Sequence, residues 1–247
     1  MKSDEVNCLK YVIDALDKHN NGEVFFTNIE SNNILLKSLK EVQSNPNKTK
    51  FPDFVSNDII VEHFSITSGK ENRKGSVFKQ KEIIQNKENE KKIKEWQEDF
   101  LKTPFKNNII KSDYIENIYN DFTYKNFIDS INRVLKKHID SLIKYELNNR
   151  KVVFLIELQD ASLQIYRNLN YKKPYELNKD KGTLDILKQY VDMIDVIIFR
   201  ANDRLEIIDM KKIDKLYEDS ICENDIRGGR YRKVKSSVCI DMNDLVN

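Results

Sequence analysis

The chain has 247 residues, of which 39% are hydrophobic and 33% are charged, and its formal net charge at pH 7 is +2. This length suits one large domain or two small ones, and the apolar content can build a packed core. The nearly balanced charge excludes a polycation that binds nucleic acid through bulk charge alone. No apolar run approaches the ~18 residues that a membrane span needs.

Residues 1–5 lack the apolar core of a signal peptide. The cysteines are three in number and scattered, and the three histidines also lie far apart in the sequence. This distribution argues against a disulfide framework and against a zinc cluster. We therefore expect a cytoplasmic protein with reduced thiols and no membrane association.

The N-terminal part of the chain is predicted to form helices and then a β-hairpin. Apolar residues recur at helical spacing from Val6 to Leu16 and again from Ile34 to Val42. Residues 51–55 and 59–67 are predicted to be extended, with a turn at Asn57-Asp58 between them. The second segment is rich in β-branched and aromatic residues, which is typical of a central strand.

The middle of the chain contains a charged segment, a long helix and a buried strand. Residues 82–102 predict a highly charged helix within a helical insertion at about 82–120. A longer helix runs from about Thr123 to Asn148, and His138 lies on its apolar stripe, which favours a core position. The nearly continuous apolar run at Lys151–Leu158 predicts a strand that is covered on both faces.

The C-terminal part is predicted to be an α/β extension at about 180–247. It begins with a short helix at residues 183–192. A hairpin follows, in which Asn202-Asp203 separates Val196–Phe199 from Leu205–Ile208. The order of elements predicts a single α/β domain over residues 1–247, with a mixed central sheet flanked by helices.

The residues most informative about function are Pro52-Asp53 and Glu62. A short hairpin would bring the two carboxylates close together. Like charges held close repel each other, and a hard divalent cation commonly offsets that repulsion. The pattern therefore favours a Mg²⁺ or Mn²⁺ site formed by Asp53 and Glu62. The alternative is a turn residue at Asp53 and a solvent-facing edge residue at Glu62.

Asp53, Glu62 and their setting resemble the core of the PD-(D/E)XK nuclease superfamily, over about residues 30–160. In that superfamily a helix precedes a β-meander whose strands carry the Asp and then Glu-x-Lys, and a further helix and strand follow. The resemblance implies a restriction-endonuclease-like core and a metal that polarises the scissile phosphate of DNA and activates a water. Asp53 and Glu62 would be catalytic residues and metal ligands, in defence or in a mobile element.

The chain departs from the superfamily pattern at the lysine. That position, two residues after Glu62 and on the same face of the strand, holds Phe64. The cation would then come from elsewhere, and we favour Lys74 as the catalytic lysine because Gly75 would allow a close approach to phosphate. Without such a cation, the chain would be a non-catalytic nucleic-acid-binding or interaction protein with the nuclease fold. A structural or regulatory α/β protein is a third hypothesis.

Basic residues outside the acidic pair, and two polar residues of the predicted strands, are further candidates. Basic side chains that would contact a phosphate backbone are Lys79, Arg227, Arg230 and Arg232, with a solvated basic loop as the alternative. His63 faces away from Glu62 and is expected to be a packed, hydrogen-bonded residue. Glu157 is expected to form an ordinary salt bridge, or to lie beside the site.

Overall fold

A computed structural model describes residues 3–18, 24–27, 30–47, 50–69, 111–116, 120–160, 163–168, 171–221, 225–228, 230–231 and 234–239, with helical positions between 84 and 98. The chain divides into two compact units. The first comprises residues 1–69 and 122–229, and the second comprises residues 70–121 and 230–247. The range predicted as a single domain thus contains two units, because the insertion is grouped with the C-terminal residues.

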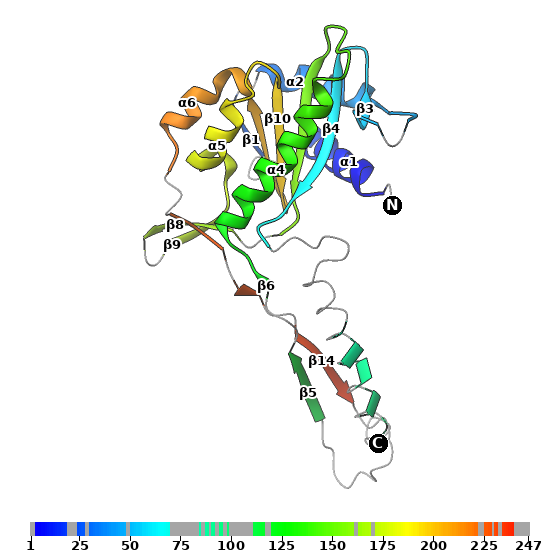
Figure 1. The fold of residues 1–247 in the computed structure, drawn as a ribbon, viewed down its shortest axis with the longest axis vertical. Helices are drawn as coiled ribbons and strands as arrows, with labels where there is room; N and C mark the ends of the chain where they lie inside the picture. The colour runs from blue at the N-terminus through cyan, green and yellow to red at the C-terminus, as the bar shows by residue number, and fades with distance from the viewer. Residues whose placement is uncertain are drawn as a thin grey trace. The chain divides into compact units, whose positions relative to one another are not determined.

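The first unit is built on a seven-stranded mixed sheet with the strand order β1-β11-β10-β7-β4-β3-β2 (Figure 1). Neighbours β4, β7 and β10 are parallel, whereas β2, β3 and β4 form an antiparallel meander. β11 is antiparallel to β10 and parallel to β1. The strands are β1 (Val24–Phe26), β2 (Gln43–Ser44), β3 (Phe54–Val55), β4 (Ile59–Ile66), β7 (Lys151–Leu158), β10 (Val196–Ala201) and β11 (Arg204–Asp209).

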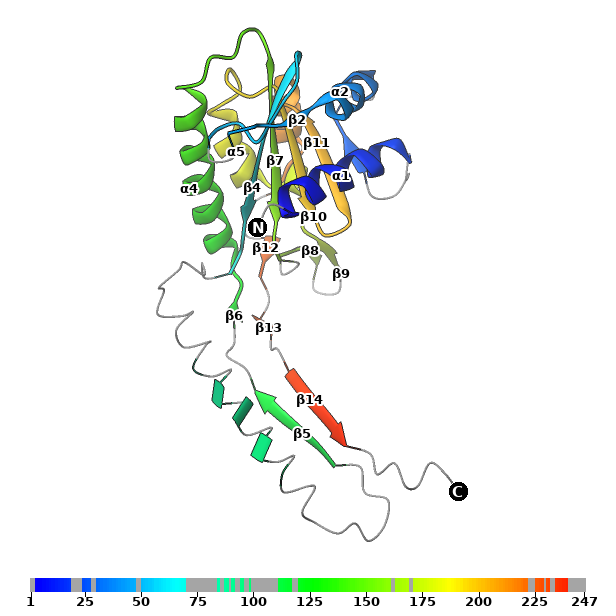
Figure 2. The same cartoon turned by 90° about the vertical axis from the view of Figure 1, so that its right-hand side faces the viewer.

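Helices cover both faces of this sheet (Figure 2). On one face, α1 (Ser3–Asp17) and α2 (Glu30–Glu41) share a buried apolar cluster with the strands. On the other face, α4 (Tyr124–Leu142), α5 (Lys181–Lys188) and α6 (Ile213–Glu218) share a second cluster with them. The predicted α/β class, with a mixed central sheet flanked by helices, is confirmed.

Strand β4 contributes side chains to both clusters. Ile60 and Phe64 pack in the cluster that contains α4, whereas Ile59 and Val61 pack in the cluster that contains α1. This division follows from the alternation of side chains along a strand. Glu62 and the residue after it therefore point to opposite faces of the sheet, which gives each face one ionisable side chain from β4.

Helix α4 is the crossover between the parallel strands β4 and β7. Its N-cap is Thr123, whose side chain accepts a hydrogen bond from the Asn126 amide. The helix ends at Leu142, earlier than the predicted Asn148. Asn148 and Asn149 instead have φ values of 49° and 64°, in the left-handed region that asparagine tolerates. They form the turn that leads into β7.

The predicted strands 59–67 and 151–158 are neighbours in one sheet, as expected. The hairpin around Asn202 is also present, with a φ of 53° at Asn202. The segment predicted as extended at residues 51–55 differs, since only Phe54 and Val55 are in a strand. Pro52 has no N–H to donate to a sheet, and this limits the strand at its N-terminal end.

Shorter elements lie beside the central sheet in the first unit. A three-stranded sheet has the order β12-β8-β9. Two 3₁₀ helices, η1 (Leu177–Lys179) and η2 (Met210–Lys212), precede α5 and α6. The strands of the smaller sheet are β8 (Gln164–Asn168), β9 (Tyr171–Pro174) and β12 (Ile226–Arg227).

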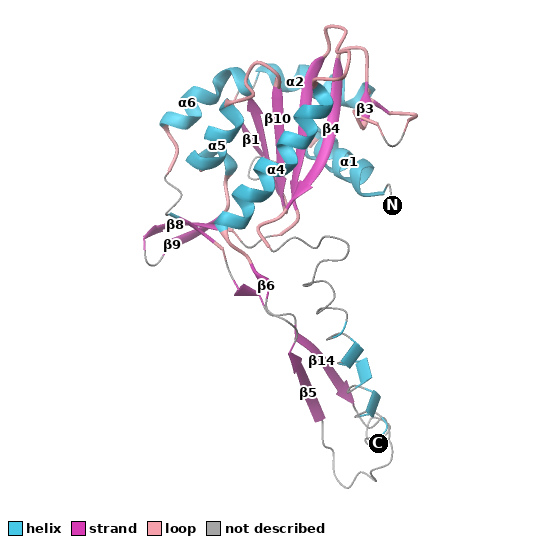
Figure 3. Ribbon diagram, viewed as in Figure 1, coloured by secondary structure: helices cyan, strands magenta, loops and turns pink. Residues whose placement is uncertain are grey.

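In the second unit, β5 (Lys111–Glu116) pairs antiparallel with β14 (Val234–Cys239) (Figure 3). A shorter pair joins β6 (Asn120–Asp121) to β13 (Arg230–Tyr231). The described positions between 84 and 98 are helical, in agreement with the predicted charged helix. The predicted insertion at about 82–120 is therefore only partly helical, because its later residues form strands with a partner distant in the sequence.

Candidate functional site

Asp53 and Glu62 lie opposite each other across the β3–β4 pair. The register pairs Phe54 with Val61 and Val55 with Ile60, which places Asp53 opposite Glu62 one step further along. The Asp53 amide donates to Glu62 Oε2 over 3.1 Å. The expected proximity of these two acidic residues is therefore observed, and both carboxylates belong to one hydrogen-bonded arrangement.

The environment of Asp53 disfavours its negative charge. Burial raises the pKa of Asp53, and the nearby Glu62 carboxylate raises it further. The His63 amide donates to Asp53 Oδ2 over 2.9 Å and acts in the opposite direction, toward a lower pKa. The net shift is upward, so a proton or a cation at Asp53 would relieve the repulsion between the carboxylates.

His138 from α4 completes this arrangement. Its Nδ1 lies 2.6 Å from Glu62 Oε1, and its ring stacks on Phe64 with centroids 4.5 Å apart. Phe64, two residues after Glu62 on β4, therefore packs against the imidazole that contacts Glu62. We predicted a core residue at His138 and overlooked this contact. The available signal was that the apolar stripe of α4 must face the same side of β4 as Glu62 and Phe64.

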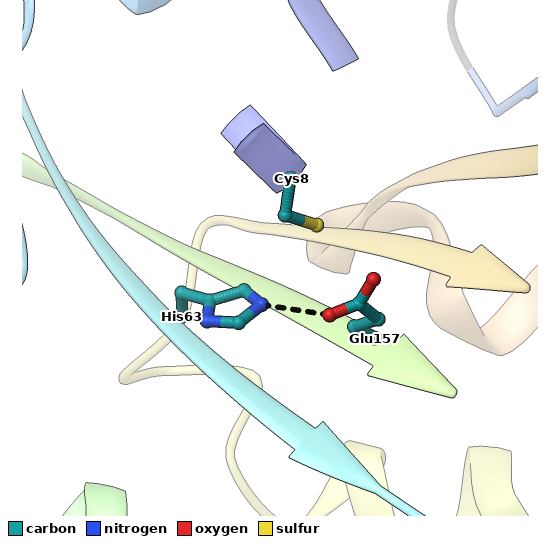
Figure 4. Close-up of side chains that lie close together, drawn as sticks. All are labelled: Cys8, His63 and Glu157. Carbon is teal, nitrogen blue, oxygen red and sulfur yellow. Dashed lines mark ion pairs between the residues drawn. The ribbon is translucent and has the colours of Figure 1, made fainter. Parts of the chain in front are cut away.

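A second cluster lies on the opposite face of β4 and joins three elements (Figure 4). Cys8 comes from α1, His63 from β4 and Glu157 from β7. One ligand atom from each lies within 4.8 Å of the others, and no other such group of three metal-ligating side chains occurs among the described residues. We expected scattered cysteines and histidines to stay apart. That inference was wrong for Cys8 and His63, because packing of α1 on the sheet brings them together.

The imidazole of His63 is buried without a hydrogen bond at one nitrogen. Its Nε2 lies 3.4 Å from Glu157 Oε2, which is an ion pair by distance but too long for a well-formed N–H···O bond. Within the part of the chain that the structure describes, Nε2 has no hydrogen-bond partner. Burial alone would lower the pKa of His63, but Cys8 and Glu157 raise it to about 9. His63 is therefore packed as predicted, but its Nε2 lacks a well-formed hydrogen bond among the described residues.

Glu157 links the cluster to a cavity at the carboxyl ends of the parallel strands. Its Oε1 accepts a hydrogen bond from Arg200 over 2.9 Å, as expected for a salt bridge. Contact with His63 lowers the pKa of Glu157, burial opposes this, and Arg200 lowers it further. The cavity has a volume of about 620 Å³, and its lining includes Asn7, Ser65, Glu157 and Arg200.

Two other buried carboxylates are satisfied within the protein. Asp180 accepts hydrogen bonds from the hydroxyls of Tyr124 and Tyr175, over 2.5 and 2.6 Å. Glu206 accepts the amide of Leu177 over 2.9 Å, and burial raises the pKa of Glu206 to about 6. These partners anchor η1 and α5 to the sheet, so both carboxylates have structural roles.

The remaining candidate residues are the basic side chains that were predicted to act on phosphate. Lys74, Lys79 and Arg232 lie outside the described residues. Arg227 is exposed on β12, with its guanidinium 5.2 Å from the centroid of the Tyr166 ring. Arg230 is in β13, in the second unit, where its backbone pairs with β6. Their proposed contacts with nucleic acid stay predictions.

Comparisons with known proteins add no family. No family model, curated protein or solved structure matches the chain. In the described parts of the chain, none of the helices has the length and apolar character needed to span a bilayer.

Proposed function

We propose that this chain is a divergent PD-(D/E)XK nuclease that hydrolyses phosphodiester bonds in DNA with Mg²⁺ or Mn²⁺. The observation that carries the proposal is the placement of Asp53, just before β3, opposite Glu62 in β4. The order α2, β2–β3–β4, α4 and β7 also agrees with the helix, meander, helix and strand that the resemblance implies. A cytoplasmic location is part of the same proposal.

The two acidic side chains are suited to hold a hard cation. Carboxylate oxygens are the preferred ligands of Mg²⁺. Burial raises the pKa of Asp53, and the Glu62 carboxylate raises it further; a cation would offset the repulsion between the two carboxylates. When bound, the metal would polarise the phosphate and lower the pKa of an attacking water. Asp53 and Glu62 would position it, while His138 orients the Glu62 carboxylate through the 2.6 Å contact.

Phe64 cannot supply the positive charge that a phosphate needs. Lys74 keeps its proposed role, since it follows β4 by only a few residues. His138 is the other candidate, because its imidazole already lies against Glu62. Lys74 and His138 can be distinguished as sources of the positive charge. Lys74→Met would reduce cleavage but leave the stability contributed by the Glu62–His138 contact unchanged, whereas a substitution of His138 would remove that contact.

The second candidate function is a non-catalytic nucleic-acid-binding protein with the same fold. This second function is favoured because both carboxylate oxygens of Glu62 already have partners within the protein. Such bonds stabilise the fold and compete with a metal for the same lone pairs. In this case neither Mg²⁺ nor Mn²⁺ would bind at Asp53.

Cleavage of single- and double-stranded DNA in Mg²⁺ or Mn²⁺ tests the proposal. Glu62→Gln and Asp53→Asn should each lower the rate at least ~100-fold, the low end for a positioned catalytic group. Asp58→Asn is the matched control, because Asp58 is an exposed acid in the same hairpin. Thermal unfolding of each variant separates loss of chemistry from loss of fold.

Wild-type protein that cleaves neither DNA nor RNA with either metal would contradict the nuclease proposal. Binding of DNA with a steep salt dependence in that protein would then favour the non-catalytic binder. Equal loss of activity in Asp58→Asn and Asp53→Asn would show that the hairpin, rather than a metal site, is required.

A further inference from the structure

The cluster on the α1 face of β4 has the composition of a transition-metal site. It contains a thiol, an imidazole and a carboxylate, whereas Mg²⁺ would require oxygen ligands. We propose that Cys8, His63 and Glu157 bind a zinc ion, with a water from the adjacent cavity as the fourth ligand. This inference concerns a site separate from Asp53 and Glu62, and it does not depend on the proposed nuclease activity.

The first support is the geometry of the nitrogen and oxygen atoms. Tetrahedral Zn²⁺, with bonds of about 2.0–2.2 Å to nitrogen and oxygen, separates two such ligands by roughly 3.4 Å. His63 Nε2 and Glu157 Oε2 are 3.4 Å apart. The spacing is long for a hydrogen bond and suits the edge of a coordination tetrahedron. The Cys8 sulfur, one ring nitrogen of His63 and one carboxylate oxygen of Glu157 all lie within 4.8 Å of one another, so a small rotamer adjustment would complete the three ligands.

The second support is the unsatisfied nitrogen of His63. The side chain is 6% exposed, and its Nε2 faces Glu157 with no hydrogen-bond partner among the described residues (Figure 4). A buried polar atom without a partner carries a free-energy cost. A metal ion would use the lone pair of this nitrogen and remove that cost. A catalytic Cys–His–acid arrangement would instead use both ring nitrogens, one toward the thiol and one toward the acid.

The charges and the surrounding contacts also suit Zn²⁺. A thiolate at Cys8 and a carboxylate at Glu157 together balance a divalent cation. Arg200 holds Glu157 Oε1 over 2.9 Å, which leaves Oε2 directed at the cluster. Outer partners of this kind commonly orient metal ligands.

The fourth ligand would come from the cavity of about 620 Å³ beside Glu157. Glu157 lines this cavity, and so does Asn7, the neighbour of Cys8 on α1. Zinc sites with three protein ligands keep a position for water or another small ligand, whereas closed structural sites use four protein ligands. The proposed site would therefore tie α1 to β4 and β7 and leave one position accessible.

Titration of the metal-free protein with Zn²⁺ and with Co²⁺, in the absence of DNA, tests this site. Zn²⁺ should bind in competition with a chelating dye, saturate at one ion per chain and resist excess Mg²⁺. Co²⁺ should give thiolate charge-transfer absorption and the visible bands of a tetrahedral ion. Added imidazole should change the Co²⁺ spectrum if the fourth position is open. An unchanged spectrum would overturn the open position.

Variants assign the ligands. Cys8→Ser should abolish the thiolate absorption and weaken Zn²⁺ binding at least ~100-fold. Glu157→Gln, which keeps the shape of a partly buried side chain, should weaken Zn²⁺ binding at least ~10-fold. Cys239→Ser is the matched control, because Cys239 lies in the second unit. Circular dichroism in the absence of metal checks that each variant is folded. Should Cys8→Ser not fold, Glu157→Gln provides the measurement.

Three outcomes would overturn the proposal. These are the absence of thiolate absorption in wild-type protein, its persistence in Cys8→Ser, and Zn²⁺ affinity unchanged by Glu157→Gln. Each is independent of DNA cleavage, so failure of the nuclease proposal leaves this test intact. Conversely, a protein that cleaves DNA in Mg²⁺ but shows no thiolate–Co²⁺ complex would keep the first site and lose the second.

Discussion

Glu62 and His63 are neighbours on β4, but they point to opposite faces of the sheet and differ in how their side chains are hydrogen-bonded. Toward α4, Glu62 has protein partners at both oxygens, His138 at 2.6 Å and the Asp53 amide at 3.1 Å. Toward α1, His63 has an ion-pair contact at 3.4 Å and no hydrogen bond at Nε2 among the described residues. A satisfied polar group stabilises a fold without a ligand, whereas an unsatisfied buried nitrogen indicates a missing partner.

The difference in hydrogen bonding affects how easily each cluster could bind a metal ion. The acidic pair toward α4 was predicted from the sequence and is proposed to bind a hard cation, in competition with existing hydrogen bonds. The cluster toward α1 was not predicted. Among the described residues, a softer metal would replace no hydrogen bond at His63 Nε2, although the imidazole must lose its proton first. The following predictions test the contrast through stability, in order of decreasing expected effect.

The largest effect is expected on the α4 face, from removal of one partner of the Glu62–His138 contact. Glu62→Leu should lower the free energy of unfolding by roughly 3–5 kcal/mol, the range for breaking a buried pair. The double variant Glu62→Leu/His138→Leu should recover part of this loss, because no unpaired group remains. Urea unfolding of the single and double variants measures the coupling. A strictly additive double variant would contradict the coupling of these residues.

The next effect is a pH dependence that arises on the α1 face. The pKa of His63 is about 9 in the folded protein, against 6.5 for an ordinary histidine. A group whose pKa rises on folding stabilises the fold when it is protonated. The stabilisation should be fully present below pH 6.5 and be lost as the pH rises to about 9. It amounts to roughly 3 kcal/mol at most.

Unfolding of wild-type protein and His63→Gln between these pH values measures this contribution. The groups that face the imidazole are Cys8 from α1 and Glu157 from β7, with Arg200 of β10 behind Glu157. The difference between the two stability curves should shrink with rising pH. Saturating Zn²⁺ should reverse the trend in wild-type protein, because a metal-bound imidazole must be deprotonated. Parallel curves without metal would contradict the raised pKa.

The smallest effect is expected at Asp53. Its pKa is raised on folding, so ionisation of Asp53 opposes folding as the pH rises through its folded value. Asp53→Asn removes that charge and keeps an oxygen to accept the His63 amide. At neutral pH we expect an equal or slightly higher melting temperature, with a free-energy change within about 1 kcal/mol. A clear loss of stability would show that the Asp53 carboxylate is a structural anchor.

The effect of Mg²⁺ or Mn²⁺ on the melting temperatures of wild-type protein and Asp53→Asn tests whether the acidic pair binds the ion. If Asp53 and Glu62 bind the ion, it should raise the melting temperature of wild-type protein by mass action, by an amount equivalent to about 2.7 kcal/mol at 100 times Kd. Asp53→Asn should lose this increase. An equal increase in the variant would place the ion elsewhere.

The sequence by itself determined the features that depend on local pattern. Continuous apolar runs identified β4 and β7, and helical periodicity identified α1, α2 and α4, because burial of a strand or helix face imposes its own period. The contact between Asp53 and Glu62 was also predictable, since a short hairpin permits few registers. Turn residues at Asn202-Asp203 identified the β10–β11 hairpin in the same way.

Only the tertiary structure decided the contacts between distant segments. Nothing in the local pattern of residues 111–116 indicates that they pair with β14, and they were predicted to belong to a helical insertion at about 82–120. Cys8, His63 and Glu157 belong to three elements whose packing depends on the whole sheet. The role of His138 required the crossing of α4 over β4. In each case sequence separation is uninformative, because packing of helices on a sheet joins residues by their position on a face and not by their order in the chain.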